Sequence, residues 1–295
     1  MTRKLLIIIG LISFQFSIAQ IQGTIINSDT NQSISFASIW IENTNIGTTS
    51  DKNGVYQLDK TDNSNIVVFS AIGYQTQRIE FDLLKDSIRL KSISEPYPKL
   101  ENINSSRKKK RTTSIGKYDK AKTKRFFGAG NLPGITARFF EYNNSYSKTP
   151  FLNEISILTS SDISRAKFLI KLYKKDSVGN PGDYIYHKNI IGVSRRGKRS
   201  TKINLSDLNI KFPEKGLFVG IEWLIIEDNK FEYSYISPGK KGELTDISYE
   251  PAFGMISSST LNNSWSFFQG HWTRIPKDPR NHEFKLLALE LELSD

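Results

Sequence analysis

The stretch that decides the fold is Ser35–Tyr74, SFASIWIENTNIGTTSDKNGVYQLDKTDNSNIVVFSAIGY. Short runs of β-branched and aromatic residues alternate here with turns rich in Gly, Asn and Asp. The segment Asp51–Gly54 predicts the turn of a β-hairpin, and Ile66–Ser70 is an apolar run typical of a buried strand. Together with the flanking residues, the pattern predicts seven short strands between residues 20 and 91. This spacing indicates a small antiparallel β-sandwich.

The same segment carries a pattern of spaced Gly, Asp and apolar residues. The pattern is Ile21-x-Gly23-x-Ile25, Phe36-Ala37-x-Ile39-x-Ile41, Gly47-Thr48-x-x-Asp51-x-Asn53-Gly54-x-Tyr56-x-Leu58 and Val68-x-x-x-x-Gly73-Tyr74. It resembles the carboxypeptidase regulatory-like domain. The resemblance implies a transthyretin-like, seven-stranded β-sandwich that accompanies other domains and has no peptidase chemistry of its own.

Residues 1–19 predict a cleaved signal peptide. Arg3 and Lys4 precede an apolar run, Leu5–Phe16, and Ser17-Ile18-Ala19 fits a small-x-small cleavage site. The apolar run is shorter than the about 20 residues that a membrane-spanning helix needs. We therefore expect an exported chain that begins at Gln20 and has no transmembrane segment after cleavage. It would lie in the periplasm, at the outer-membrane surface or outside the cell.

The composition excludes several kinds of site. The sequence has no cysteine, which rules out disulfides, thiolate nucleophiles and cysteine-bound zinc. The formal net charge is +11 and falls to +9 when Arg3 and Lys4 leave with the signal peptide. Five of the basic residues form one run, Arg107–Arg111. In an exported protein this run favours a solvated linker, with contact to an anionic surface polymer as the alternative, and we expect no nucleic-acid partner.

Residues 92–118 predict a basic linker, and residues 119–295 predict a second β domain. About eight to ten strands are expected there, which favours a jelly-roll-like β-sandwich. Ala166–Tyr173 is assigned to a strand, and a helix is the less favoured alternative because Ile170–Lys174 lacks a clean periodicity of 3.6 residues. The most hydrophobic segment is Gly216–Ile226, which we expect to be a central strand that pairs with Phe231–Ile236 across a hairpin turn.

No catalytic or cofactor motif is apparent. The sequence lacks a Gly-x-Ser-x-Gly elbow and a phosphate-binding loop. The three histidines lack the spacing of metal ligands, so no metal site or cofactor is expected. They are His187, His271 and His282. Asp176, Asn180 and Asp183 offer three oxygen ligands to calcium, but two neighbouring lysines favour an ordinary turn.

Two weaker signals point to possible chemistry. Glu222 stands between Ile221 and Trp223; burial would raise its pKa and suit it to act as an acid in glycoside hydrolysis. We favour the alternative that the Glu222 side chain faces solvent or a basic neighbour. Aromatic residues of the second domain could stack on sugar rings, although a place in the core is favoured for most of them. The candidate ligand-binding residues are Trp265, Trp272, Tyr233 and Tyr235, within a wider set that includes Phe267 and Phe268.

The sequence therefore favours a non-enzymatic, exported protein with a binding or scaffold role at the cell envelope. Its first domain would act as a stem or spacer, and its second would bind a ligand. A surface polysaccharide or another envelope protein is the expected partner. The alternatives are a carbohydrate-binding accessory protein and a glycoside hydrolase that uses Glu222.

Overall fold

Strands make up nearly all of the regular structure, as the sequence predicts. A computed structural model describes residues 20–59, 66–93, 111–239 and 242–295. The predicted signal peptide lies outside these residues, and so does the basic run except for Arg111. The only helical elements in the described ranges are four short 3-10 turns, at Phe81–Leu83, Asn144–Lys148, Ser206–Leu208 and Glu227–Asn229. None of these turns is long and apolar enough to cross a membrane.

Seven strands form the first domain, which confirms the predicted number. They are β1 (Gln20–Asn27), β2 (Ser38–Ile41), β3 (Gly47–Thr49), β4 (Val55–Asp59), β5 (Ile66–Ser70), β6 (Gln77–Glu80) and β7 (Ser87–Leu90). One sheet has the order β4-β1-β7 and the other β3-β2-β5-β6. The pair β1 and β7 is parallel, and the other pairs are antiparallel. Buried Ile25, Ile39, Tyr56 and Phe69 fill the space between the two sheets.

Asp51 and Gly54 build the turn before β4. The Asp51 carboxylate accepts hydrogen bonds of 2.8 Å from the backbone N–H groups of Asn53 and Val55. Gly54 has a φ of +79°, and a Cβ there would lie 2.8 Å from the carbonyl oxygen of Ile25. The turn therefore requires a glycine at this position, for backbone conformation and for space.

Two seven-stranded sheets form the second domain. The first, called the β16 sheet, contains β10 (Ile135–Phe140), β12 (Lys167–Lys175), β13 (Pro181–Tyr184), β14 (Ile190–Val193), β16 (Leu217–Trp223), β20 (Ser264–Phe268) and β21 (His271–Arg274). The other, called the β11 sheet, contains β8 (Thr112–Ile115), β9 (Arg125–Phe127), β11 (Phe151–Ser160), β15 (Arg199–Asn204), β19 (Ala252–Ser258), β22 (Phe284–Leu287) and β23 (Leu289–Ser294).

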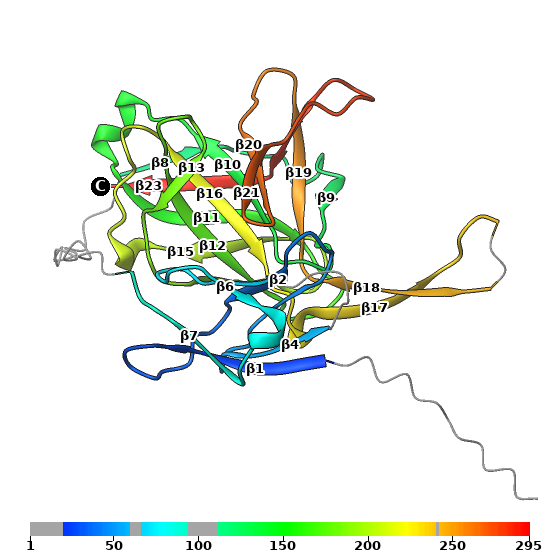
Figure 1. The fold of residues 1–295 in the computed structure, drawn as a ribbon. Helices are drawn as coiled ribbons and strands as arrows, with labels where there is room; N and C mark the ends of the chain where they lie inside the picture. The colour runs from blue at the N-terminus through cyan, green and yellow to red at the C-terminus, as the bar shows by residue number, and fades with distance from the viewer. Residues whose placement is uncertain (1–19, 60–65, 94–110, 240–241) are drawn as a thin grey trace, which may run out of the picture.

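The strand order of both sheets is set by long-range antiparallel pairing. The β16 sheet runs β13-β12-β16-β10-β20-β21, with β14 also paired to β12. The β11 sheet runs β22-β19-β11-β23-β8, with β15 paired to β11 and β9 paired to β19. Figure 1 shows the two domains in contact, with the first domain below the second.

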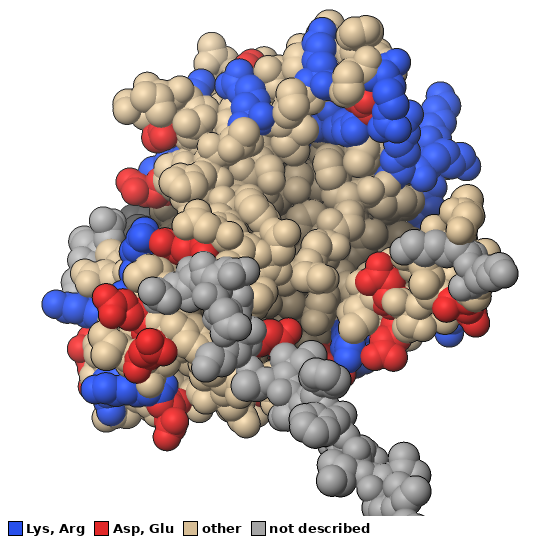
Figure 2. All heavy atoms as spheres, turned by 45° about the vertical axis from the view of Figure 1, so that its right-hand side comes forward, with Lys and Arg blue, Asp and Glu red and all other residues tan. Residues whose placement is uncertain are grey.

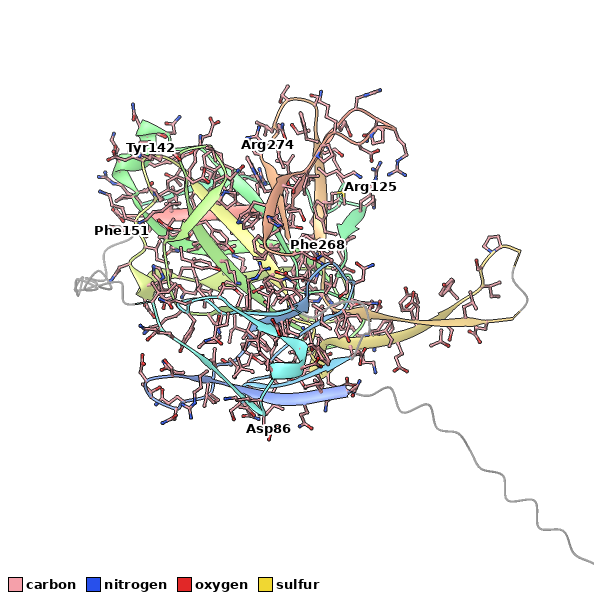
Figure 3. The ribbon with its side chains drawn as sticks, viewed as in Figure 1. Asp86, Arg125, Tyr142, Phe151, Phe268 and Arg274 are labelled. Carbon is pink, nitrogen blue, oxygen red and sulfur yellow. The ribbon has the colours of Figure 1, made fainter. Side chains whose placement is uncertain are left out.

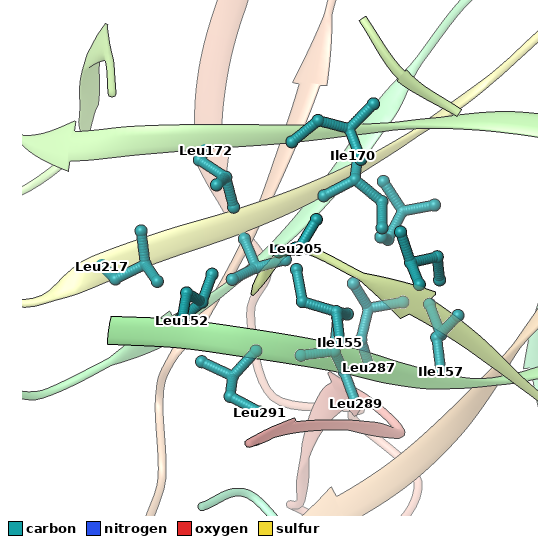
Figure 4. Close-up of a cluster of buried hydrophobic side chains, with 14 of the residues drawn as sticks. Leu152, Ile155, Ile157, Ile170, Leu172, Leu205, Leu217, Leu287, Leu289 and Leu291 are labelled. Atoms are coloured by element: carbon teal, nitrogen blue, oxygen red, sulfur yellow. The ribbon is translucent and has the colours of Figure 1, made fainter. Parts of the chain in front are cut away.

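The core of the second domain lies between its two sheets. Alternate residues of β12 and β16 meet alternate residues of β11 and β23, as expected for strands with one buried face. Figure 4 shows this contact, with Ile170 and Leu172 on one side and Ile155 and Leu291 on the other. The alternating C-terminal leucines of the sequence therefore supply one wall of a β-sandwich.

A buried arginine links the two sheets at one end of this core. Arg138 on β10 donates hydrogen bonds of 3.0 Å to the carbonyl oxygens of Leu287 and Leu289. Burial lowers the pKa of Arg138 to about 10, so the side chain remains charged at neutral pH. Its hydrogen bonds compensate part of the cost of burying that charge.

The structure differs from the sequence prediction in two places. The predicted hairpin between Gly216–Ile226 and Phe231–Ile236 is wrong, because β16 pairs with β10 and β12. The following strand, β17 (Lys230–Tyr235), pairs instead with β18 (Leu244–Tyr249), and Figure 1 shows the two strands leaving the body as an arm. In addition, β8 lies within the predicted linker and pairs with β23, so the second domain begins before residue 119.

The chain leaves the β16 sheet after Trp223 because its next residues contact the first domain. The backbone N–H of Ile225 donates to Thr49 Oγ1 over 3.0 Å, and the Thr49 N–H donates to the Ile225 carbonyl over 3.1 Å. Phe36 of the first domain packs with Leu224 and Ile226. These contacts use the residues that a hairpin with β17 would have required, and they join the first domain directly to the second.

Glu222 forms a buried polar link between the domains. Its Oε1 accepts a hydrogen bond of 2.7 Å from Ser38 Oγ of the first domain, and its Oε2 lies 2.7 Å from Lys171 Nζ on β12. The side chains of Lys171 and Glu222 are only 7% and 3% exposed. Burial alone would lower the pKa of Lys171, but attraction to Glu222 and Tyr184 outweighs this effect and raises the pKa. Lys171 therefore stays charged opposite the carboxylate.

We expect Glu222→Gln to lower the free energy of unfolding by about 3–5 kcal/mol, because it leaves the Lys171 charge buried without its counter-ion. Adding Lys171→Met should recover most of this loss, since the double variant contains no unpaired buried charge. Urea denaturation of the mature protein measures both effects. The control is Glu232→Gln, which removes an exposed partner of Lys230 and should change stability by less than about 1 kcal/mol. Equal stability of Glu222→Gln and wild type would contradict this account.

Candidate binding site

An open cleft of about 430 Å³ lies where the two domains meet, and we call it the junction cleft. Asn45 lines it from the turn between β2 and β3 of the first domain. From the second domain it is lined by residues of the 127–136 segment, by Trp223 at the end of β16, and by Ser266–Phe268 of β20. Figure 3 shows Phe268 near the first domain, below Arg125 and Arg274.

The loop that precedes β10 holds one side of the junction cleft. Buried Leu132 packs against Trp40 and Val68, which anchors the loop to the first domain. Gly47 permits this approach, because a Cβ at that position would lie 2.5 Å from the Leu132 side chain. Nearer the start of the same loop, a Cβ at Gly128 would meet no atom within 4 Å. The loop is therefore fixed at one end and leaves open space at the other.

The lining of the junction cleft is aromatic and uncharged. Phe127, Trp223, Phe267 and Phe268 supply the rings, and the Phe268 side chain is 49% exposed. Among the described residues, no Lys, Arg, Asp, Glu or His belongs to the lining, although the protein is strongly basic. The cleft volume falls within the about 300–1,000 Å³ of small-ligand sites. These properties suit a ligand that places an apolar face in the cleft.

Two side-chain amides at the junction cleft are available to such a ligand. Asn45 and Asn131 are both exposed and line the cleft. Neither amide makes a hydrogen bond to another residue within the described part of the chain. Each carries a carbonyl acceptor and an N–H₂ donor. An amide can form hydrogen bonds with the hydroxyls of a sugar, and a neighbouring aromatic ring can pack against the apolar face of the same sugar.

Two basic segments, residues 120–125 and 274–285, are joined by an ion pair between Arg125 and Asp278, and we call their Lys and Arg side chains the basic face. It comprises Lys120, Lys122, Lys124, Arg125, Arg274, Lys277, Arg280 and Lys285. Figure 2 shows an uncharged surface that is hollowed in its middle, with Lys and Arg side chains gathered above it and to its right. The protein therefore presents a neutral hollow beside a strongly positive surface.

Asp278 holds part of the basic face together. Its carboxylate lies 2.9 Å from Lys285 Nζ, 3.1 Å from an Arg280 nitrogen and 3.7 Å from an Arg125 nitrogen. The side chain of Asp278 is only 1% exposed. Hydrogen bonds from Arg280 and Lys285 hold the pKa of Asp278 well below its usual range. One carboxylate thus organises three cations and leaves their combined charge positive.

Comparison with family models places the first domain in a known family. Residues 21–104 match the CarboxypepD_reg-like domain. This confirms the resemblance stated above for the N-terminal segment, and the matched region extends past β7. The chain gives no match to curated proteins and none to solved structures. The junction cleft therefore lies between a CarboxypepD_reg-like domain and a β-sandwich for which these comparisons give no relative.

The structure does not bring the four predicted ligand-binding residues onto one surface. Trp265 is 2% exposed, and its indole N–H donates a hydrogen bond of 3.1 Å to Asn180 Oδ1. Trp272 is partly buried against Tyr173 and Phe267. Tyr233 and Tyr235 lie on the separate arm and are 38% and 42% exposed.

The other sequence candidates have ordinary structural roles. The carboxylate of Asp176 accepts hydrogen bonds from the N–H groups of Val178 and Asn180, which makes this segment a turn. The basic neighbour expected for Glu222 is Lys171. Within the described residues, no group of three His, Cys, Asp or Glu side chains is placed to hold a metal ion.

Sequence reasoning missed the two asparagines and the loop of the junction cleft. The run Gly128-Ala129-Gly130-Asn131 was the available signal, because closely spaced glycines often mark exposed loops. Asn45 could not be assigned in this way, since it belongs to a distant turn of the CarboxypepD_reg-like domain. Phe267 and Phe268 were part of the wider aromatic set, and the structure places both in the cleft.

We expect Asp278→Asn to destabilise the protein at neutral pH, because it removes the counter-ion of three cations. The pKa of Asp278 is lowered by folding, so its contribution is present above the unfolded value of about 3.9. The stability difference between wild type and variant should therefore shrink as the pH falls below about 4. Urea denaturation at pH values from 7 down to 2.5 measures this change. A difference that stays constant over this range would contradict the assignment.

Proposed function

We propose that this protein is a non-enzymatic binding protein of the cell envelope and that its ligand is a surface polysaccharide. The observation that carries the proposal is the junction cleft, with its exposed Phe268, its two free amides and its uncharged lining. Aromatic faces and amide groups match the apolar faces and hydroxyls of sugars. The N-terminal segment, with the pattern of a signal peptide, supports export to the periplasm, the outer-membrane surface or the outside of the cell.

The environment of Glu222 favours binding over glycoside hydrolysis. Hydrolases of this type use two carboxyl groups about 5–9.5 Å apart, on either side of the scissile bond. In the described part of the chain, the polar groups that contact the Glu222 carboxylate belong to Lys171 and Ser38. These contacts join the domains, and they leave the carboxylate buried instead of facing the cleft. We therefore assign Glu222 a structural role.

A screen of the intact mature protein against immobilised polysaccharides tests the proposal. We expect at least one polysaccharide to bind, and we expect Phe268→Ala to weaken that binding by about tenfold, which corresponds to about 1.4 kcal/mol. Asn131→Ala should also weaken it, because the ligand loses a hydrogen-bond partner.

The matched control is Leu261→Ala. Leu261 is 46% exposed, close to the value for Phe268, but it does not line the junction cleft. This variant should bind as the wild type does. If no polysaccharide binds, or if Phe268→Ala and Leu261→Ala bind equally well, the junction cleft is not the site.

A further inference from the structure

We infer that the polysaccharide is acidic and that the basic face binds its anionic groups while the junction cleft takes the apolar faces of its sugar rings. This inference rests on the proposed function and specifies the class of ligand. The contact between the protein's cations and the anionic polymer is thereby assigned to the folded second domain. The sequence alone suggested such a contact only for the Arg107–Arg111 run. Three features of the basic face support this inference: its charge, its free cations and its connection to the cleft.

The basic face carries a large excess of positive charge. The two segments that build it are residues 120–125 and 274–285, and the ion pair between Arg125 and Asp278 joins them. Their eight Lys and Arg side chains are accompanied by three nearby carboxylates, Asp119, Asp278 and Glu283. A surface with this imbalance attracts polyanions over a distance of about 8 Å at physiological ionic strength.

Several cations of the basic face have no carboxylate partner. Lys124 and Arg274 form no ion pair with any residue in the described ranges. The Arg274 guanidinium lies over the Trp265 ring, 4.5 Å from its centroid, and Lys277 lies in the same way over Phe284 at 4.9 Å. Contact with a ring orients a cation without neutralising it. Arg274 and Lys277 are therefore positioned for an external anion, and Lys124 is exposed to solvent.

The basic face and the junction cleft share strands. Arg125 and Phe127 are two positions apart on β9, so their side chains point to the same side, about 6.8 Å apart along the strand. On β20, Phe267 of the cleft is two positions from Trp265, which contacts Arg274. Two separate connections therefore run from the uncharged cleft to the basic face, one to Arg125 and one to Arg274, which has no carboxylate partner in the described residues. Neighbouring units of one polysaccharide chain can reach both surfaces.

The test compares two polymers that share one backbone, polygalacturonate and its fully methyl-esterified form, for binding to the intact mature protein. The test variant changes Lys124, Arg274 and Lys277 to Gln. The control variant changes Lys148, Lys211 and Lys215 to Gln, which removes the same charge from exposed positions outside the basic face. Binding is measured by calorimetry at about 50 mM and about 300 mM salt, because the higher concentration screens the attraction between charges more strongly.

We expect the wild type and the control variant to bind polygalacturonate about tenfold or more tightly than the ester at low salt, and we expect high salt to remove the preference. The test variant should bind both polymers equally. Equal loss of the preference in both variants would overturn the inference, because it would show an effect of net charge alone. Equally tight binding of double-stranded DNA would also overturn it, by showing a general polyanion surface.

The outcomes separate this inference from the proposed function. Binding of both polymers with equal affinity, weakened by Phe268→Ala, would remove the acidic specificity and leave the junction cleft as a sugar site. Strong preference for polygalacturonate without any effect of Phe268→Ala would support the basic face and contradict the role of the cleft.

Discussion

The buried carboxylate of Glu222 is the interaction on which the relative position of the two domains depends. It joins Lys171 of its own sheet to Ser38 of the CarboxypepD_reg-like domain, over a separation of 184 residues between Ser38 and Glu222. A buried ion pair is costly unless its members keep their partners and geometry. A sliding movement of one domain over the other would break the Ser38 hydrogen bond and expose Phe36. These contacts therefore hold the first domain against the second.

This fixed arrangement explains why a cleft forms at the junction. The turn that carries Asn45 follows directly from β2, the strand that contains Ser38. Leu132 packs on the first domain through Trp40, and its loop forms the opposite wall. The aromatic rings of β20 and Trp223 come from the second domain alone. Because the lining combines both domains, neither domain on its own provides the complete site.

The first domain could be predicted from the sequence because its signals are local. Asp51 and Gly54 act within one turn, and the strands follow from the residues between turns. The second domain depends on pairings between distant strands, which a local pattern does not specify. Trp265 is an example. The alternation of side chains on β20 places Trp265 and Phe267 on the same face of the sheet, but it does not show whether other residues cover that face. Likewise, the sequence shows that Glu222 stands between apolar residues, but only the fold identifies Lys171 and Ser38 as its partners.

The most direct test of a binding site shared by both domains is hydrogen–deuterium exchange of the intact mature protein, with and without a saturating oligogalacturonate. We expect slower exchange in three separate segments. These are the turn around Asn45, the loop of residues 127–136 and residues 264–268 of β20. Protection confined to one domain, or found only on the arm formed by β17 and β18, would contradict the account.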